Sequence, residues 1–294
     1  MIALGNYNSS PYDITRETIT FEEVYKKMAK EHFPKVSDSA VENYSNCFRK
    51  YCKPLYKTRF KDIRHTHLQG IIDDCGMAHP TRAMIKTVFR LMFKFAMKND
   101  IVNKDYSKYV DVGQREGKIN RTPFSQEEIQ KLFDNVNKMK FIDTILIMIY
   151  TGLRIGELLD IRIENVHLDE DYMIGGLKTE AGKNRTIPIN SKIKPYIKRY
   201  YEINKDREYL ITNFKGNQMS YSNYRREKFD NIMEKLEMKH RPHDARHTFA
   251  SLMDSANANK LCIKRIMGHS SSDITDNVYT HKTLEELKEA IALI

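Results

Sequence analysis

The chain has 294 residues, of which 40% are hydrophobic and 30% are charged. This composition is typical of a protein with packed cores, and the length favours two domains over one. The longest apolar run, "ILIMIY" at residues 145–150, is shorter than the roughly 18 residues of a membrane-spanning helix. The N-terminus lacks the pattern of a secretory signal, so we expect a cytoplasmic protein without a membrane partner.

Basic residues outnumber acidic ones, which favours a polyanionic partner. The formal net charge is +10 and the isoelectric point is about 9.2. Attraction and the release of counterions both favour binding to nucleic acid, but charge alone does not identify the partner. The cysteines show no paired spacing, so reduced thiols are expected at Cys47, Cys52, Cys75 and Cys262.

The first part of the chain reads as a leader and then a helical domain. Residues 1–19 are polar and carry turn-forming residues, which predicts an extended leader. A helical pattern then begins, because Thr20 and Glu23 match a capping box ahead of a one-sided apolar pattern. We expect further helices at about 37–53, 65–75 and 80–98. Residues 20–112 are therefore predicted to form a small all-helical domain.

The helix expected at 80–98 carries a row of basic residues. Arg82, Lys86 and Arg90 are spaced four apart, which aligns them on one face beside a broad apolar face. Such a row suits either a solvated surface or the major groove of DNA. These three residues are therefore candidate DNA-binding residues, and the second domain has to decide between the alternatives.

A second domain is expected after a short linker. Residues 113–122 contain two glycines and one apolar residue, which predicts an interdomain linker. The domain expected over 123–282 opens with a capping box formed by Ser125 and Glu128. An apolar helix follows at about 141–150.

The pattern then changes to short runs broken by turn residues. This change predicts a small antiparallel sheet, with Pro188 on an edge strand. Helices are expected again at about 191–202, 220–237, 243–256, 260–267 and 271–279, with a tail helix within 283–294. The predicted fold class is mainly α with a small antiparallel β-sheet.

One motif, "TGLRIGELLDI" at 151–161, is typical of an anion site. Arg154 lies at the start of a helix, where a guanidinium and the helix N-terminus can both bind an anion. Glu157 is three residues further on the same face and can orient that guanidinium. The alternative is an ordinary salt bridge at a helix end.

Three other stretches contribute polar residues of the same kind. "GGLKTEAGKNRTIPI" has Lys178 near the end of a strand, and "HDARHTFAS" has His243 and Arg246 on one helix face. "IMGHSSSDITDNVYTH" has His269 directly after a helix and Tyr279 ten residues later. Taken singly, each fits an exposed or structural residue.

Together these residues predict phosphoryl transfer. The set holds no carboxylate pair and no metal-ligand cluster. Arginine suits bidentate phosphate binding, and a tyrosine hydroxyl can attack phosphorus to form a covalent ester. Fixed arginine and histidine donors can stabilise the charge of a pentavalent phosphorus without a metal ion.

The boxes "TGLRIGELL", "LKT", "HDARH", "MGH" and "DNVYTH" resemble the signature of the tyrosine recombinase (phage integrase) family, in order and spacing, across about 120–282. The helical first domain resembles the core-binding domain of that family. The leader and "TFEEVYKKM" are similar to integrases of Gram-positive phages and conjugative transposons. Two departures, Ala245 and Met267 in place of leucines, change packing and leave the polar residues in place.

The resemblance implies a role for each motif residue. Tyr279 is the expected nucleophile, which would keep the 3′ side of the cut as a phosphotyrosine, and Lys178 is the expected general acid. Arg154 and Arg246 would hold the non-bridging oxygens. The remaining implied roles are hydrogen bonding to phosphate for His243 and His269, with His243 as the proton acceptor, support of the arginine by Glu157, and structural roles for His247 and His281.

The resemblance also implies a setting. It predicts integration and excision of a mobile element or prophage by a homotetramer on double-stranded DNA recombination sites, with host bending or directionality factors as further partners and with no metal, ATP or other cofactor. The alternatives are relaxation of DNA like a type IB topoisomerase and a non-catalytic DNA-binding regulator. The intact catalytic set argues against the regulator.

Both ends of the chain carry a further expectation. The tail at 283–294 has an apolar stripe that can dock on a neighbouring protomer or on its own domain. The stripe comprises Leu284, Leu287, Ile291 and Ile294. Integrases of this kind often begin with an arm-binding domain that would precede the leader, so we expect a truncated or a naturally short form.

Overall fold

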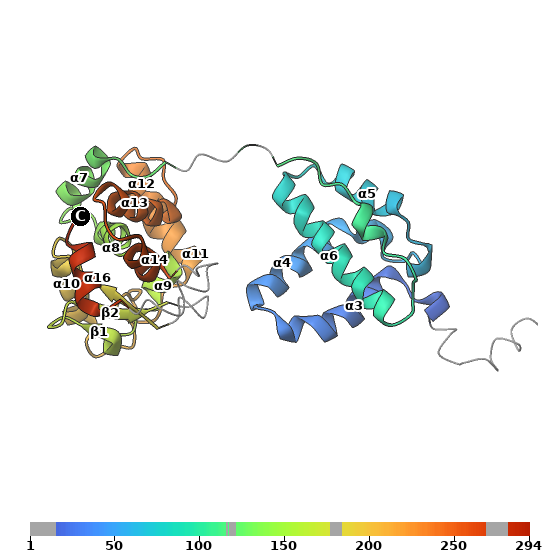
Figure 1. The fold of residues 1–294 in the computed structure, drawn as a ribbon, viewed down its shortest axis with the longest axis horizontal. Helices are drawn as coiled ribbons and strands as arrows, with labels where there is room; N and C mark the ends of the chain where they lie inside the picture. Colours follow the sequence, from blue (N-terminus) through green and yellow to red (C-terminus); the bar gives the residue numbers. More distant parts are fainter. Residues whose placement is uncertain (1–15, 116, 118–121, 177–183, 269–281) are drawn as a thin grey trace, which may run out of the picture. The chain divides into compact units, whose positions relative to one another are not determined.

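The computed structural model describes residues 16–115, 117, 122–176, 184–268 and 282–294. The chain divides into two compact units, Met1–Lys118 and Ile119–Ile294 (Figure 1). Within the described residues, no helix is long and apolar enough to cross a membrane. These residues are mostly helical and contain one three-stranded antiparallel sheet, which confirms the predicted fold class.

The regular secondary structure in the described part of the first unit is helical, apart from an isolated bridge between Thr20 and Arg59. The expected capping box is present, because the Thr20 hydroxyl accepts from the Glu23 N–H and the Glu23 carboxylate accepts from the Thr20 N–H. All four expected helices are present. They are α3 (Phe21–His32), α4 (Asp38–Tyr51), α5 (His65–Asp74) and α6 (His79–Lys98), with short 3₁₀ turns at Phe33–Lys35, Lys53–Leu55, Phe60–Asp62 and Tyr106–Tyr109.

Helix α6 forms the centre of this unit and packs against α3, α4 and α5. Its apolar side chains Phe89 and Phe93 are fully buried, as are Phe21 and Phe60 from the segments that face it. Burial of large aromatic side chains is the main source of stability in a core of this size. The apolar face predicted for 80–98 is therefore the core of the unit.

The second unit is built around α8 (Ile142–Thr151), in which all ten residues are buried. A helix that is buried on every side lies inside a domain, and α8 packs against α7, α10 and α13. The other helices are α7 (Gln126–Asn135), α9 (Ile155–Leu159), α10 (Lys194–Asn204), α11 (Tyr221–Tyr224), α12 (Asp230–Lys235), α13 (Pro242–Ser255), α14 (Lys260–Met267) and α16 (Leu284–Ile291).

The sheet of this unit has the strand order β1 (Val166–His167), β2 (Tyr172–Gly175) and β3 (Arg185–Pro188). Met173 of β2 lies opposite Val166 on one side and Ile187 on the other. β3 is an edge strand of this sheet, so the placement of Pro188 is confirmed.

The helices expected at 220–237 and at 271–279 have different outcomes. The helix expected at 220–237 is present, but a π-helical turn at Arg225–Phe229 separates α11 from α12. Local propensity does not distinguish a π turn from an α turn. The helix expected at 271–279 lies outside the described residues.

The tail helix α16 packs on its own unit, against α14 and β3 (Figure 1). Leu287 and Ile291 join a buried cluster with Phe249 and Ile266. The amide of Asn190 donates to the carbonyls of Ile291 and Ile294, at 2.8 and 2.9 Å. Of the two docking alternatives, this structure has the tail on its own domain.

Candidate active site

The turn between α8 and α9 presents the first motif arginine. Gly152 ends α8 with a left-handed backbone, φ 65°. A Cβ at this position would lie 2.6 Å from the Phe249 ring, so a larger residue would be both strained and obstructed. The chain leaves this glycine and starts α9 with Arg154 as its N-cap.

Arg154 and Glu157 form the predicted pair. The Arg154 N–H donates to one Glu157 carboxylate oxygen at 2.8 Å, and its Nη1 donates to the other at 2.9 Å. The Arg154 side chain is 29% exposed, whereas that of Glu157 is only 2% exposed. Glu157 therefore holds Arg154 from inside the protein, and part of the guanidinium still reaches solvent.

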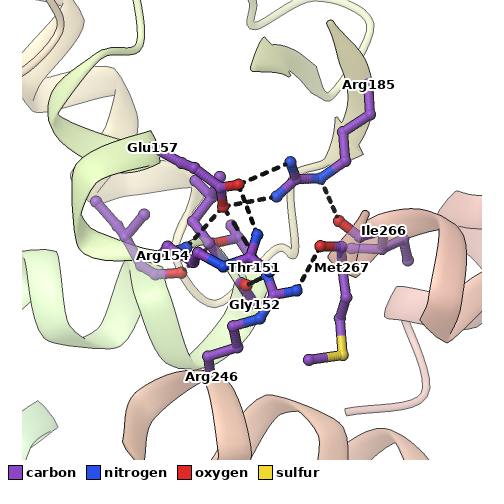
Figure 2. A network of polar contacts seen from close by, with 10 residues as sticks. Thr151, Gly152, Arg154, Glu157, Arg185, Arg246, Ile266 and Met267 are labelled. Carbon is purple, nitrogen blue, oxygen red and sulfur yellow. Dashed lines mark hydrogen bonds and ion pairs between the residues drawn. The ribbon is translucent and has the colours of Figure 1, made fainter. Parts of the chain in front are cut away.

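Three guanidinium groups surround this one carboxylate, as Figure 2 shows. Arg185 of β3 donates to both Glu157 oxygens, at 2.9 and 3.2 Å. Nη1 of Arg246 lies 3.9 Å from the same carboxylate. Three positive groups against one negative group leave an excess of two positive charges, which favours binding of an anion.

The protonation states follow from the same contacts. Burial alone would raise the pKa of Glu157, but the hydrogen bond and charge of Arg185, followed by those of Arg154, outweigh it and lower that pKa below its usual value. Burial, together with the nearby charge of Arg154, lowers the pKa of Arg246 to about 10. Glu157 is therefore ionised and Arg246 protonated at neutral pH.

Arg246 joins the ends of two helices. Its side chain on α13 is 2% exposed, and its Nη groups donate to the carbonyls of Gly152 and Met267, each at 2.5 Å (Figure 2). Gly152 ends α8, and Met267 ends α14. The guanidinium is therefore fixed by main-chain acceptors next to Arg154 and Glu157.

His243 lies three residues before Arg246 on α13 and is exposed. Its ring lies edge-on to that of His247, with the centroids 4.9 Å apart. The start of the helix is fixed because the Asp244 carboxylate accepts from the Arg241 N–H at 2.8 Å. His243 and Arg246 thus belong to one helix, as the motif predicted.

Three predicted site residues, Lys178, His269 and Tyr279, lie outside the described residues, as does His281. The chain on either side of two of these segments is described. Arg185 follows the segment with Lys178, and Met267 is the second residue before His269. The structure therefore brings together Arg154, Glu157 and Arg246, and the catalytic role of every predicted site residue stays a prediction.

Sequence reasoning missed Arg185. The signal that could have found it is the alternation in "RTIPI", which puts Arg185 on the same strand face as the buried Ile187. An arginine on a buried strand face needs an acidic or carbonyl partner. That partner, Glu157, is 28 residues away along the chain, so no local motif names it.

The DNA-binding candidates of the first unit are not equivalent in the structure. Nε of Arg82 donates to the Met77 carbonyl and Nζ of Lys86 to the Val110 carbonyl, both at 2.5 Å. Arg90 is exposed. Arg82 and Lys86 therefore hold loops of their own unit, and a DNA contact by any of the three stays a prediction.

The mainly helical fold with its small sheet and the cluster of three guanidinium groups around Glu157 form a candidate anion site, and comparison with known proteins identifies the family. The model of the phage integrase family matches residues 122–286. Since this match covers more than half of the chain, the chain belongs to the phage integrase family. The resemblance stated from the motifs is confirmed.

Similar proteins include tyrosine recombinases of bacteria and archaea. Tyrosine recombinase XerA of Pyrococcus furiosus is 30% identical over 179 residues, which is 57% of this chain and 59% of XerA. Tyrosine recombinase XerD of Oceanobacillus iheyensis is 25% identical over 281 residues, which is 86% of this chain and 91% of XerD. The chain thus aligns with less than two thirds of XerA but with most of XerD.

Solved structures show the same fold. The Tn1549 transposon integrase, in complex with transposon right end DNA, has a TM-score of 0.74 at 20% identity, covering 92% of this chain and 98% of that one. A lambda integrase tetramer bound to a Holliday junction has a TM-score of 0.74 at 14% identity, covering 88% and 80%. At this identity the likeness is one of fold.

Proposed function

We propose that the protein is a site-specific DNA recombinase that cuts and rejoins strands through a phosphotyrosine formed on Tyr279. The observation that carries the proposal is the cluster of Arg154, Arg185 and Arg246 around Glu157, with Arg154 partly exposed. A buried excess of positive charge next to a partly exposed guanidinium suits a phosphodiester.

In the proposed reaction, each proton that moves is accepted or supplied by a residue of this chain. The Tyr279 oxygen attacks the scissile phosphorus, and His243 accepts the phenolic proton. The bond from phosphorus to the 5′ oxygen breaks, and Lys178 supplies a proton to that oxygen. Arg154 and Arg246 stabilise the charge that develops on the non-bridging oxygens, and His269 adds a hydrogen bond.

The chemistry requires no external energy source. The attack exchanges one phosphate ester for another, so the bond energy is kept in the covalent intermediate. Attack on that intermediate by a 5′ hydroxyl from another strand reverses the step and joins the strands. The fixed charges of Arg154 and Arg246 supply the electrostatic stabilisation that this exchange needs.

The proposed setting is recombination of two DNA sites by four protomers in the bacterial cytoplasm, for integration and excision of a mobile element or prophage. Support comes from two structural neighbours, one a lambda integrase tetramer on a Holliday junction and the other a transposon integrase on transposon DNA. Host bending or directionality factors belong to the same proposal.

The nucleophile is tested with a suicide DNA substrate, from which the cut strand end diffuses away. The wild-type protein should form a covalent protein–DNA adduct, and Tyr279→Phe should abolish the adduct while sparing DNA binding. Tyr109→Phe is the matched control, because Tyr109 is an exposed tyrosine, 60% accessible, in the other unit. An adduct formed by Tyr279→Phe would show that Tyr279 is not the nucleophile.

A second experiment separates recombination from relaxation. Two plasmid-borne target sites should recombine in the presence of the protein, whereas a supercoiled plasmid without a site should stay supercoiled. Relaxation of any plasmid without joint formation would favour the topoisomerase alternative. DNA binding without an adduct would favour the regulator.

A further inference from the structure

Arg185 is almost fully buried, and its guanidinium donates to partners within its own unit. Its side chain is 3% exposed. Its Nη groups donate to both Glu157 oxygens, and its Nε donates to the Ile266 carbonyl at 2.7 Å (Figure 2). Through these contacts Arg185 can act on Glu157 and on the end of α14.

These bonds connect three separate parts of the site. Glu157 lies in α9, which begins at Arg154, and Ile266 lies in the last turn of α14. Arg185 itself opens β3. One side chain therefore sets the spacing between α9, α14 and β3, the elements that adjoin the predicted catalytic segments.

Stability alone is a weak reason for such a pair. Taking two charges out of water costs several kcal/mol, and well-packed apolar residues often replace a buried ion pair without loss of stability. A role in arranging the other charges accounts for the pair better, because Glu157 has only two oxygens to share among three arginines.

Arg185 also limits what Glu157 can do to its neighbours. While Arg185 occupies both carboxylate oxygens, Nη1 of Arg246 stays 3.9 Å from the carboxylate. Without Arg185, the carboxylate would be free to pair bidentately with Arg246 or Arg154. Either pairing would neutralise a guanidinium that the phosphate needs.

We propose that Arg185 is a positioning residue for strand cleavage, which holds Glu157 so that Arg154 and Arg246 keep their charge and orientation for the phosphate. The inference rests on the proposed function. It adds to that function a residue outside the motif set, and a mechanism in which one arginine keeps a carboxylate from pairing bidentately with Arg246 or Arg154.

The test is single-turnover cleavage of a suicide substrate at saturating DNA. Arg185→Met should form the covalent adduct roughly 10- to 100-fold more slowly, the scale for a small misplacement of catalytic groups, while DNA affinity stays within about twofold of wild type. Arg185→Lys keeps the charge without the fork geometry and should fall between the two.

The final amount of adduct distinguishes a positioning defect from a folding defect. A positioning defect lowers the rate constant and leaves the final amount of adduct unchanged, whereas loss of folded protein lowers the amount and leaves the rate constant unchanged. Arg199→Met is the matched control, since Arg199 pairs with Asp143, another carboxylate that is 2% exposed, away from the cluster. It should cleave at the wild-type rate constant.

A double variant tests the capture mechanism. Glu157→Gln combined with Arg185→Met removes the charge that would capture the arginines, and should cleave several-fold faster than Arg185→Met alone. Independent, additive losses in the double variant would overturn the proposal, as would an unchanged rate constant for Arg185→Met. If the wild-type protein forms no adduct, the proposed function itself fails.

Discussion

Glu157 determines how the arginines around it are arranged. It is almost fully buried, accepts from Arg154 and Arg185, and lies within 3.9 Å of Arg246. A buried carboxylate in this position makes two of the arginines more rigid without cancelling the charge of the group. Rigid charge is what transition-state stabilisation requires, because fixed donors need no reorganisation during the reaction.

Part of the Arg154 guanidinium reaches solvent, which leads to a first prediction. Arg154→Ala should lower the rate of adduct formation by about 100-fold or more, the scale for losing one fixed donor, and should change DNA affinity little. Arg162→Ala is the control, because Arg162 is a half-exposed arginine that also pairs with a glutamate, Glu208. A loss of affinity in Arg154→Ala with an unchanged cleavage rate would contradict the role of Arg154.

The lowered pKa of Glu157 gives a second prediction. Its folded-state pKa is below the unfolded value, so the carboxylate contributes stability that is fully present above about pH 5 and is lost as the pH falls through the folded pKa. Glu157→Gln should therefore reduce the dependence of unfolding free energy on pH below about pH 5. Urea unfolding at several pH values measures it, and parallel curves for the two proteins would refute the prediction.

Contacts between residues that are close along the chain could be predicted from the sequence. Arg154 and Glu157 are three residues apart at a helix start, so helical geometry alone brings them together. Arg185 and Glu157 are 28 residues apart, and the Arg246 acceptors Gly152 and Met267 are 94 and 21 residues away. Such contacts depend on tertiary packing, which periodicity does not encode.

Among the elements, the tail helix α16 has the most direct energetic consequence. Ile291 is 2% exposed in the cluster that α16 shares with α14, whereas Leu293 is 56% exposed. Ile291→Ala should lower the unfolding free energy by about 3 kcal/mol, and Leu293→Ala should change it by no more than about 0.5 kcal/mol. Denaturant unfolding checks both, and equal effects would mean that the tail does not dock as described.

Predicted elements agree best with the structure where capping and periodicity coincide. Ser125 and Glu128 mark the start of α7 to the residue, because the side chain of each accepts a hydrogen bond from the backbone N–H of the other. The π turn at Arg225–Phe229 was not predicted, since it differs from an α turn only in hydrogen-bond register. The tail stripe was predicted, but an apolar stripe does not say which surface covers it.

The charge of the whole molecule sets its response to salt. With a formal net charge of +10, DNA affinity should fall by roughly 10³-fold between about 50 and 200 mM salt, the scale for six phosphate contacts.

Arg90→Gln should lower the slope of that dependence by about one unit if Arg90 contacts a phosphate. Lys26→Gln is the control, because Lys26 is an exposed cation on α3. A DNA affinity that does not change with salt concentration would contradict DNA binding by the first unit.

The break between two domains and the family were predicted from the sequence for different reasons. The stretch 113–122 lacks the apolar residues that a core needs, so composition alone predicts a break there. The family followed from motif order and spacing, which chance seldom reproduces. The arrangement of charges around Glu157 required coordinates, because its members come from α9, β3 and α13.

The acceptors of Arg246, the carbonyls of Gly152 and Met267, belong to the main chain. Main-chain groups survive nearly every substitution, so mutation elsewhere on the surface leaves this anchoring intact. Because the anchoring of Arg246 uses no exposed side chain, exposed residues outside the predicted site can be varied widely, provided that the left-handed glycine is kept. Exposed side chains can then be varied without changing how Arg246 is held.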